Sequence, residues 1–218
     1  MRTMFSRYFP FAFDRQLFLA DLTEDLDWAY DLEIGVLSFD DRYQWKAEVL
    51  GTESDESGTW LWAWANDASG IPAQHQNASL KLKALGEQHG IAELTEPMVS
   101  LEYADGHAFA AIAVGQGLGK AYYRGPYEGG AAFLLITDER LQFQVDDPLR
   151  RIVTVFPQAI SVIELPDHRE AFRGYLELYG IEPHEVNGSL AVIQNSQEAL
   201  RAEFDQHGRL RELKGTLG

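Results

Sequence analysis

Tryptophan occupies every second position in the run 60–64 (WLWAW), which follows an acidic loop between Gly51 and Gly58. Because a β-strand turns successive side chains to opposite faces, this spacing predicts a strand with Trp60, Trp62 and Trp64 on one face. Such an aromatic face forms the floor either of a hydrophobic core or of a binding groove. We favour the core, in which Trp60 and Trp64 are largely buried.

Period-two alternation also marks the chain that precedes the tryptophan run. Segments 28–34 and 43–49 alternate apolar with polar residues, and the short segment 36–39 follows the first of them, bounded by Gly35 and by the Asp40-Asp41 pair. Alternation bounded by turn residues is typical of strands with one buried face. With the tryptophan strand, these segments predict a four-stranded antiparallel meander.

Four segments carry apolar residues at helical spacing or end at helix-stop signals, and we predict helices at 11–22, 73–85, 104–114 and 169–179. The third is almost wholly apolar, so we expect it to be buried and central. Between this helix and residue 137 we expect a hairpin whose tip is 125–130. The fold class predicted for the chain is α+β, a predominantly antiparallel sheet with about four helices packed on it.

The pattern changes after residue 137. We predict strands at 141–145, 190–195, 199–204 and 210–213, and a long strand pair over 151–165 that is broken at Pro157. No repeat and no flexible linker interrupts the chain. We therefore expect two lobes, an α+β lobe over 1–137 that contains the tryptophan meander and a strand-helix-strand lobe over 138–218 packed on it.

Composition narrows the classes of function. The chain of 218 residues contains no cysteine, which excludes disulfides and thiolate chemistry and suits a reducing compartment, so we expect a cytoplasmic protein. No apolar run reaches the length of a membrane span. The formal net charge of -16 repels phosphate backbones and anionic lipids, so neither nucleic acid nor membrane is an expected partner.

The negative charge is concentrated between Asp14 and Glu56. Twelve acidic residues there face only three basic ones: Asp21, Glu24, Asp25, Asp27, Asp31, Glu33, Asp40, Asp41, Glu48, Glu53, Asp55 and Glu56 against Arg15, Arg42 and Lys46. Such a segment is either a solvated face that keeps the protein soluble or a surface for a basic protein partner. We favour solubility and keep the basic partner as the alternative.

Several motifs of catalysis and ligand binding are missing. The stretch Gly115 to Lys120 has neither the spacing of a phosphate loop nor that of a dinucleotide-binding turn, so it is interpreted as a helix end and a bend. The six histidines show no i, i+4 pair for a metal, and no Gly-x-Ser-x-Gly elbow occurs. We expect no metal and no cofactor.

Four residues remain as candidates for binding: Trp62, His107, Tyr123 and Arg124. The imidazole of His107 lies near Asp105 at a predicted helix start, where a carboxylate could orient a general base, although capping is the more common role of Asp105. Trp62 and Tyr123 offer aromatic faces for sugars, cations or partners. For Arg124 we predict a structural role, a partly buried guanidinium paired with a carboxylate.

Leu50-Gly51-Thr52, the run 57–66 (SGTWLWAWAN) and the run 121–126 (AYYRGP) resemble an uncharacterised family of small bacterial proteins with a GT…SGTWLWAWAN core and a later YYRGP hairpin. The resemblance covers roughly residues 13 to 137. It implies a bacterial, intracellular α+β protein and supplies no activity, cofactor or catalytic residue.

Two hypotheses on function follow. The first is a non-enzymatic intracellular binding protein with an acidic face, since catalytic signatures are missing. The second is an enzyme acting on a small molecule or carbohydrate, with the tryptophan and tyrosine face, a carboxylate and His107. The sequence carries no signal for an oligomeric state.

Overall fold

The computed structural model describes residues 1–215, which form six α-helices and eleven strands in two compact units. The first unit contains Met1 and residues 15–142, and the second contains residues 2–14 and, of the described chain, residues 143–215. Helix α1 (Arg2–Thr23) therefore supplies residues to both units.

The first unit is built around an antiparallel sheet. Its remaining α-helices are α2 (Asn77–His89), α3 (Ala92–Thr95) and α4 (Gly106–Gly115), and three short 3-10 helices join them, η1 (Ala63–Ala65), η2 (Asp67–Ser69) and η3 (Ala73–His75). Its strands are β1 (Trp28–Asp31), β2 (Val36–Phe39), β3 (Tyr43–Ser54), β4 (Thr59–Trp62), β5 (Met98–Ser100), β6 (Ala121–Tyr127) and β7 (Gly130–Ile136).

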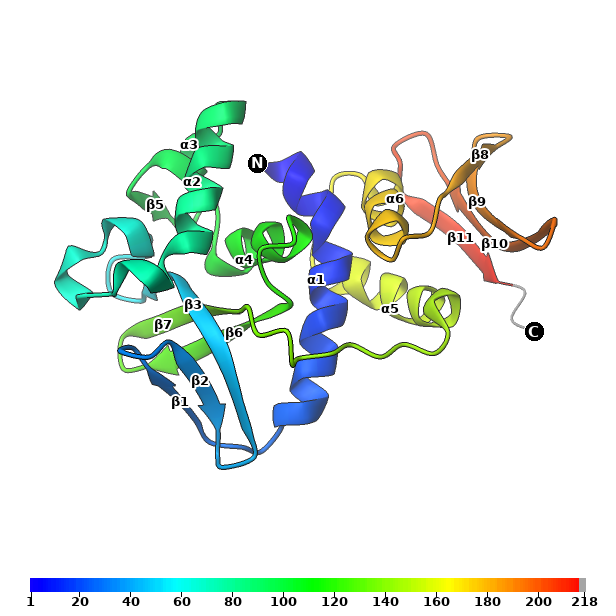
Figure 1. Ribbon diagram of the computed structural model, residues 1–218. Helices are drawn as coiled ribbons and strands as arrows, with labels where there is room; N and C mark the ends of the chain where they lie inside the picture. The colour runs from blue at the N-terminus through cyan, green and yellow to red at the C-terminus, as the bar shows by residue number, and fades with distance from the viewer. Residues whose placement is uncertain (216–218) are drawn as a thin grey trace. The chain divides into compact units, whose positions relative to one another are not determined.

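Strand β3 is the centre of this sheet. The strand order is β1-β2-β3-β4-β5, and β7 pairs with both β3 and β6, so the predicted four-stranded antiparallel meander is confirmed. β3 is 12 residues long, and its pairing with β7 shifts register between Val49 and Gly51, which marks Leu50 as a bulge. Figure 1 shows α2, α3 and α4 gathered on one side of β3 and β7, with the β1–β2 hairpin toward the other.

Helix α4 closes one face of the sheet. Trp60 and Trp62 are fully buried, and their ring centroids lie 5.1 and 4.6 Å from that of Phe109 on α4. A Cβ at Gly51 would come within 2.3 Å of the indole of Trp60, so only glycine lets β3 approach the ring this closely. The expected buried central helix and the core position of Trp60 are confirmed.

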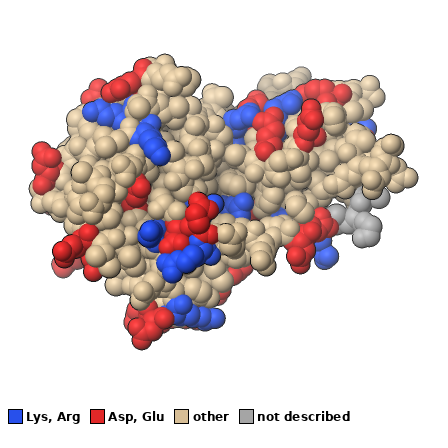
Figure 2. Space-filling view, in the orientation of Figure 1, with Lys and Arg blue, Asp and Glu red and all other residues tan. Residues whose placement is uncertain are grey.

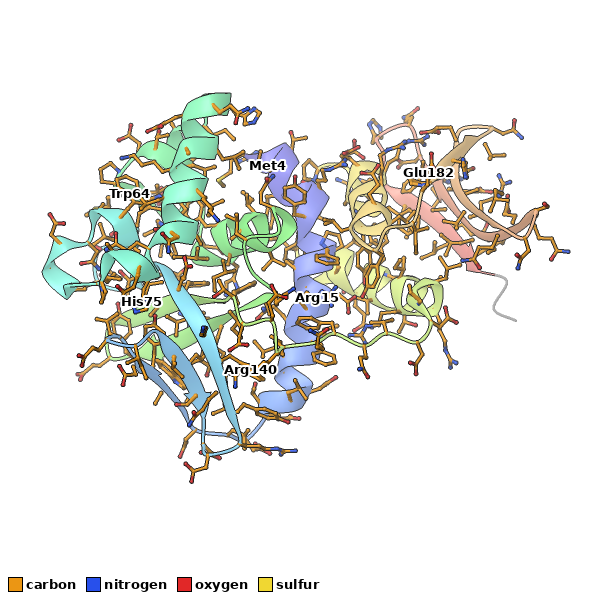
Figure 3. The ribbon with its side chains drawn as sticks, in the orientation of Figure 1. Met4, Arg15, Trp64, His75, Arg140 and Glu182 are labelled. Atoms are coloured by element: carbon orange, nitrogen blue, oxygen red, sulfur yellow. The ribbon has the colours of Figure 1, made fainter. Side chains whose placement is uncertain are left out.

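The tryptophan strand is shorter than predicted. It ends at Trp62, and Trp64 lies in η1, half-buried beside α2 with the Lys83 ammonium 4.1 Å from its ring centroid (Figure 3). The expectation that Trp64 shares a strand face with Trp60 is therefore wrong. The expected loop 51–58 is also wrong in part, because β3 continues through Ser54. Pairing with β7 and β4, which local alternation does not reveal, extends β3.

The second unit pairs two helices with a smaller sheet. Its elements are α5 (Pro148–Val162), α6 (His168–Leu178), β8 (His184–Val186), β9 (Ser189–Gln194), β10 (Gln197–Phe204) and β11 (Leu210–Gly215), in addition to residues 2–14 of α1. The strands form an antiparallel sheet of order β11-β10-β9-β8. The strand β8 was not anticipated, whereas α6 and the three later strands lie close to their predicted ranges.

Helix α5 contradicts the strand pair expected over 151–165. The Asp147 side chain accepts the Arg150 N–H at the start of the helix, and the buried residues recur every three or four positions: Leu149, Ile152, Val155, Phe156 and Ala159. Pro157, taken as a strand break, lies inside the helix. β-Branched residues and proline favour a strand or a break locally, and burial of one helical face overrides that preference. The strand expected at 141–145 is absent from the described chain.

A buried carboxylate joins three helices of the second unit. Asp14 is 3% exposed and accepts hydrogen bonds from the guanidinium of Arg151 at 2.6 Å and from the Tyr175 hydroxyl at 2.8 Å, and also from the Tyr179 hydroxyl. Burial, reinforced by the Asp14 charge, raises the pKa of Tyr175 far above its ordinary value. One cation and two hydroxyl donors compensate the carboxylate for its loss of water. Residues 2–14 therefore belong with residues 143–215, a grouping that the expected boundary at residue 138 did not anticipate.

No helix within residues 1–215 is both long enough and apolar enough to cross a membrane.

The two tryptophans test the core assignment. Truncating Trp60 to alanine is expected to lower the free energy of unfolding by about 3–5 kcal/mol, because a fully buried indole leaves a cavity. The half-buried Trp64 provides a matched control, for which the loss should be clearly smaller. Urea unfolding of Trp60→Ala and Trp64→Ala measures both, and equal losses would contradict the difference in burial.

The imidazole of His168 at the start of α6 has a pKa lowered by its surroundings. Its Nδ1 accepts the backbone N–H of Leu210 at 3.2 Å, and burial followed by the charge of Arg209 lowers its pKa, against opposing contributions from Asp167 and Asp205. Protonation removes the lone pair that this hydrogen bond needs.

A pH dependence of stability follows. Because the folded protein has the lower pKa, the unfolded chain binds the proton more strongly, so stability is present above about pH 6.5 and declines as the pH falls below it. His168→Gln, which cannot be protonated, should flatten this decline below about pH 6.5. Thermal melts of both proteins across that range measure the effect, and parallel curves would rule it out.

Candidate functional site

The first candidate site lies on the α4-covered face of the sheet, around the side chain of Glu53. Its carboxylate is buried, and Oε1 accepts the backbone N–H of Gly106, the first residue of α4, at 2.8 Å. Oε2 accepts the Nε–H of Arg124 on β6 at 3.4 Å. A negative charge at a helix N-terminus is stabilised by the helix dipole and by unpaired amides. We call Glu53, Gly106, His107, Tyr122 and Arg124 the Glu53 cluster.

A histidine and a tyrosine complete this cluster. His107 is exposed, and its Nδ1 lies 2.9 Å from the hydroxyl of Tyr122, which is buried. Burial raises the pKa of Tyr122 well above its ordinary value, and the charges of Asp105 and Glu53 raise it further. The phenol therefore stays protonated at neutral pH. It orients the imidazole and cannot act as a base itself.

The structure brings His107 and Arg124 together and separates them from the other two candidates. The expected carboxylate partner of Arg124 is Glu53, and the Arg124 side chain is 38% exposed. Trp62 is fully buried, and its indole Nε1 donates to the Glu93 carbonyl at 3.1 Å, so it offers no binding surface. Tyr123 follows Tyr122 on β6 and faces the other side of the sheet.

Sequence reasoning missed three members of the cluster, Glu53, Gly106 and Tyr122, and it counted Glu53 among the surface acids. Before the bulge, Val49 pairs with Leu134, and after it Gly51 pairs with Phe133. Neighbouring residues of β7 lie on opposite faces, so one extra residue turns Glu53 away from the face of Trp45. Only the pairing partner reveals this change, and the sequence offers no local signal for it.

The opposite face carries a continuous series of rings, which we call the aromatic chain. It runs through Tyr43, Trp45, Phe39, Tyr123 and Trp28, with successive centroids 4.9, 5.9, 4.8 and 5.5 Å apart. These rings come from four strands, so the β1–β2 hairpin and β6 approach one another across this face. Phe39 and Trp45 are buried, whereas Tyr43, Tyr123 and Trp28 at the ends are half-buried.

The acidic residues do not form one face. Glu48 and Glu53 turn inward and bond the amides of Ala78 and Gly106 at the start of two helices. Asp55 and Glu56 follow β3 at one end, and Asp41 precedes it at the other, about 36 Å away for a strand of 12 residues. The acidic side chains visible in Figure 2 accordingly lie in several separate groups.

The largest group surrounds the C-terminal end of α1, and we call it the acidic rim. Its members are exposed carboxylates of the helix end and of the β2–β3 turn: Asp21, Glu24, Asp25, Asp27, Asp40 and Asp41. The Asp40 Oδ1 accepts the Asp27 N–H at 3.2 Å, which joins the two segments. Among residues 1–215 none of the six forms an ion pair.

Within residues 1–215, no group of three or more histidine, aspartate or glutamate side chains is arranged to hold a metal ion.

The Glu53 contacts predict an ordered series of stability losses. Glu53→Ala leaves the Gly106 amide unpaired and should lower the free energy of unfolding by about 1–3 kcal/mol. Arg124→Lys loses only a half-exposed contact and should lower it by about 0–1 kcal/mol. The control is Glu56→Ala at the exposed β3–β4 turn, with an expected change within about 0.5 kcal/mol. Denaturant titration orders the three variants. A loss for Arg124→Lys as large as that for Glu53→Ala would contradict the assignment of the helix amide to Glu53.

Comparison with known proteins identifies one family. A protein family of unknown function, DUF6882, matches residues 2–139. This range contains the Glu53 cluster, the aromatic chain and the acidic rim. No curated protein and no solved structure matches the chain. Because the match covers well over half of the sequence, the chain belongs to the DUF6882 family of unknown function.

Proposed function

We propose that this chain is a non-enzymatic bacterial protein of the cytoplasm that binds a basic protein partner through the acidic rim. The observation that carries the proposal is the position of the rim at the C-terminal end of α1. The last turn of α1 contains no basic residue, while Asp21, Glu24 and Asp25 lie in it or next to it. The end of a helix carries a negative partial charge, and each acid placed there typically lowers stability by about 0.3–1 kcal/mol.

Solubility alone does not account for this arrangement. Acidic side chains keep a protein soluble wherever they are exposed, and positions away from a helix C-terminus would serve equally well. The rim combines an unfavourable helix dipole with mutual repulsion of six carboxylates, none of which forms an ion pair within residues 1–215. Binding sites commonly retain such arrangements at the expense of stability, because a partner of opposite charge relieves the repulsion.

The enzyme hypothesis has weaker support. It requires an accessible aromatic face, a free carboxylate and His107. Trp62 is buried, and the Glu53 carboxylate already accepts hydrogen bonds from Gly106 and Arg124. His107 keeps an exposed imidazole, but the carboxylate nearest to it in sequence, Asp105, accepts the Ala108 amide as a helix cap. These engagements favour binding over catalysis. The missing cysteines agree with a cytoplasmic location.

Charge-reversal variants test the two effects expected of the rim carboxylates, a lower stability and the binding of a basic partner. Asp21→Lys combined with Asp41→Lys should raise the thermal midpoint, because cations replace anions at the helix end. The same variant should capture at least tenfold less of a basic protein from a bacterial lysate. The matched control reverses two exposed acids at the far end of β3, Asp55→Lys with Glu56→Lys, and should capture as the parent does.

Salt provides a second measurement on the purified pair. Rim charges act over a Debye length of about 8 Å at physiological ionic strength, so affinity and association rate should both fall as salt rises. The proposal fails if the rim variant captures the partner normally, or if affinity is flat across the salt series.

A further inference from the structure

The two ends of the aromatic chain differ in one respect. At the β3 end, the guanidinium of Arg42 lies 5.3 Å from the ring centroid of Tyr43. At the β1 end, no cation of the described residues lies over Trp28 or Tyr123. The fold thus places its own arginine over one end of the series, whereas the half-buried Trp28 and Tyr123 at the other end have no such cation over them among the described residues.

The indole of Trp28 packs against the backbone of β6. A Cβ at Gly125 would lie 2.5 Å from Cη2 of Trp28, so the indole rests directly on the β6 backbone at a glycine. Tyr123 flanks it with a centroid distance of 5.5 Å and an interplanar angle of 56°. Both rings are half-buried. A ring pair that the fold already holds in place, and that remains partly accessible, is prepared for a contact without further loss of side-chain freedom.

The negative charge beside Trp28 favours a positively charged ligand. Asp27 directly precedes Trp28, and Phe39, which pairs with Trp28, directly precedes Asp40. Both carboxylates belong to the acidic rim. The negative face of an indole attracts cations, and nearby carboxylates strengthen that preference and repel anions.

We propose that the face formed by Trp28 and Tyr123 receives an arginine or lysine side chain of the basic partner. This inference rests on the proposed function and adds the anchoring contact to the acidic rim. The rim extends over six carboxylates, so it matches a segment with several basic side chains better than a single small cation. One of these side chains stacks on Trp28, and the others lie against the rim.

A short arginine–glycine repeat peptide is the probe, and the same peptide with citrulline in place of arginine is its neutral control. The indole N–H signal of Trp28 in nitrogen-15 NMR spectra reports the contact. The arginine peptide should shift this signal, and the citrulline peptide should not. Equal shifts by both peptides would overturn the proposal, because citrulline keeps the shape and loses the charge.

Variants measure how much the ring contributes. Trp28→Leu keeps apolar packing over Gly125 and should lower the affinity for the arginine peptide about threefold to tenfold, whereas Trp28→Phe should retain most of it. Tyr103→Leu, at a tyrosine that is 75% exposed and outside the aromatic chain, is the matched control. Thermal melts confirm that each variant is folded. Affinity unchanged by Trp28→Leu would refute the anchor.

The outcomes for the two proposals can be told apart. If the rim reversal lowers peptide affinity and Trp28→Leu does not, the acidic rim stands and the aromatic anchor falls. If Trp28→Leu lowers it and the rim reversal does not, the anchor stands and the rim proposal falls. Tetramethylammonium is the third probe, and if it perturbs Trp28 as strongly as the peptide does, the face takes a free cation and the docked side chain is excluded.

Discussion

The carboxylate of Glu53 at the start of α4 is the contact on which the first unit depends. One oxygen of this carboxylate accepts the backbone N–H of Gly106, a donor that has no partner within the helix. The other oxygen accepts a hydrogen bond from Arg124. With α4 held there, Phe109 packs on Trp60 and Trp62. Glu48 repeats the device at α2, where it accepts the Ala78 amide. Glu48 and Glu53, both on β3, thus each accept an amide at the start of a helix and hold that helix against the sheet.

The bulge at Leu50 makes this arrangement possible. It lets one strand present aromatic residues to one face and Glu53 to the other, although both sets occupy odd positions in the sequence. The two faces then differ in character. The α4 face is a closed core, and the opposite face carries rings whose ends reach solvent. Partly accessible rings are consequently found at the ends of this series, at Tyr43 and at Trp28.

The acidic residues of the segment 14–56 occupy three different structural environments. Asp14 is buried and joins α1 to α5 and α6 in the second unit, and Glu48 and Glu53 cap helices in the first. The exposed remainder lies at the end of α1 and the β2–β3 turn, at the β1–β2 turn and at the β3–β4 turn. A carboxylate that meets amides or a guanidinium stabilises the fold, whereas the rim carboxylates form no ion pair within residues 1–215 and lie at a helix C-terminus. This contrast separates the buried, structural acids from the exposed ones.

The sequence by itself determined the α+β class, the meander, the buried helix α4 and the family, because alternation, turn residues and the tryptophan run are local signals. It also identified Arg124 as a paired side chain. Tertiary structure alone decided that α5 is a helix despite Val153, Val155 and Pro157, since its apolar stripe is buried. It alone decided the partner of Arg124, the position of Trp64 and the separation of the acids. Each of these depends on register or burial between segments distant in sequence, and local periodicity carries no record of such pairing.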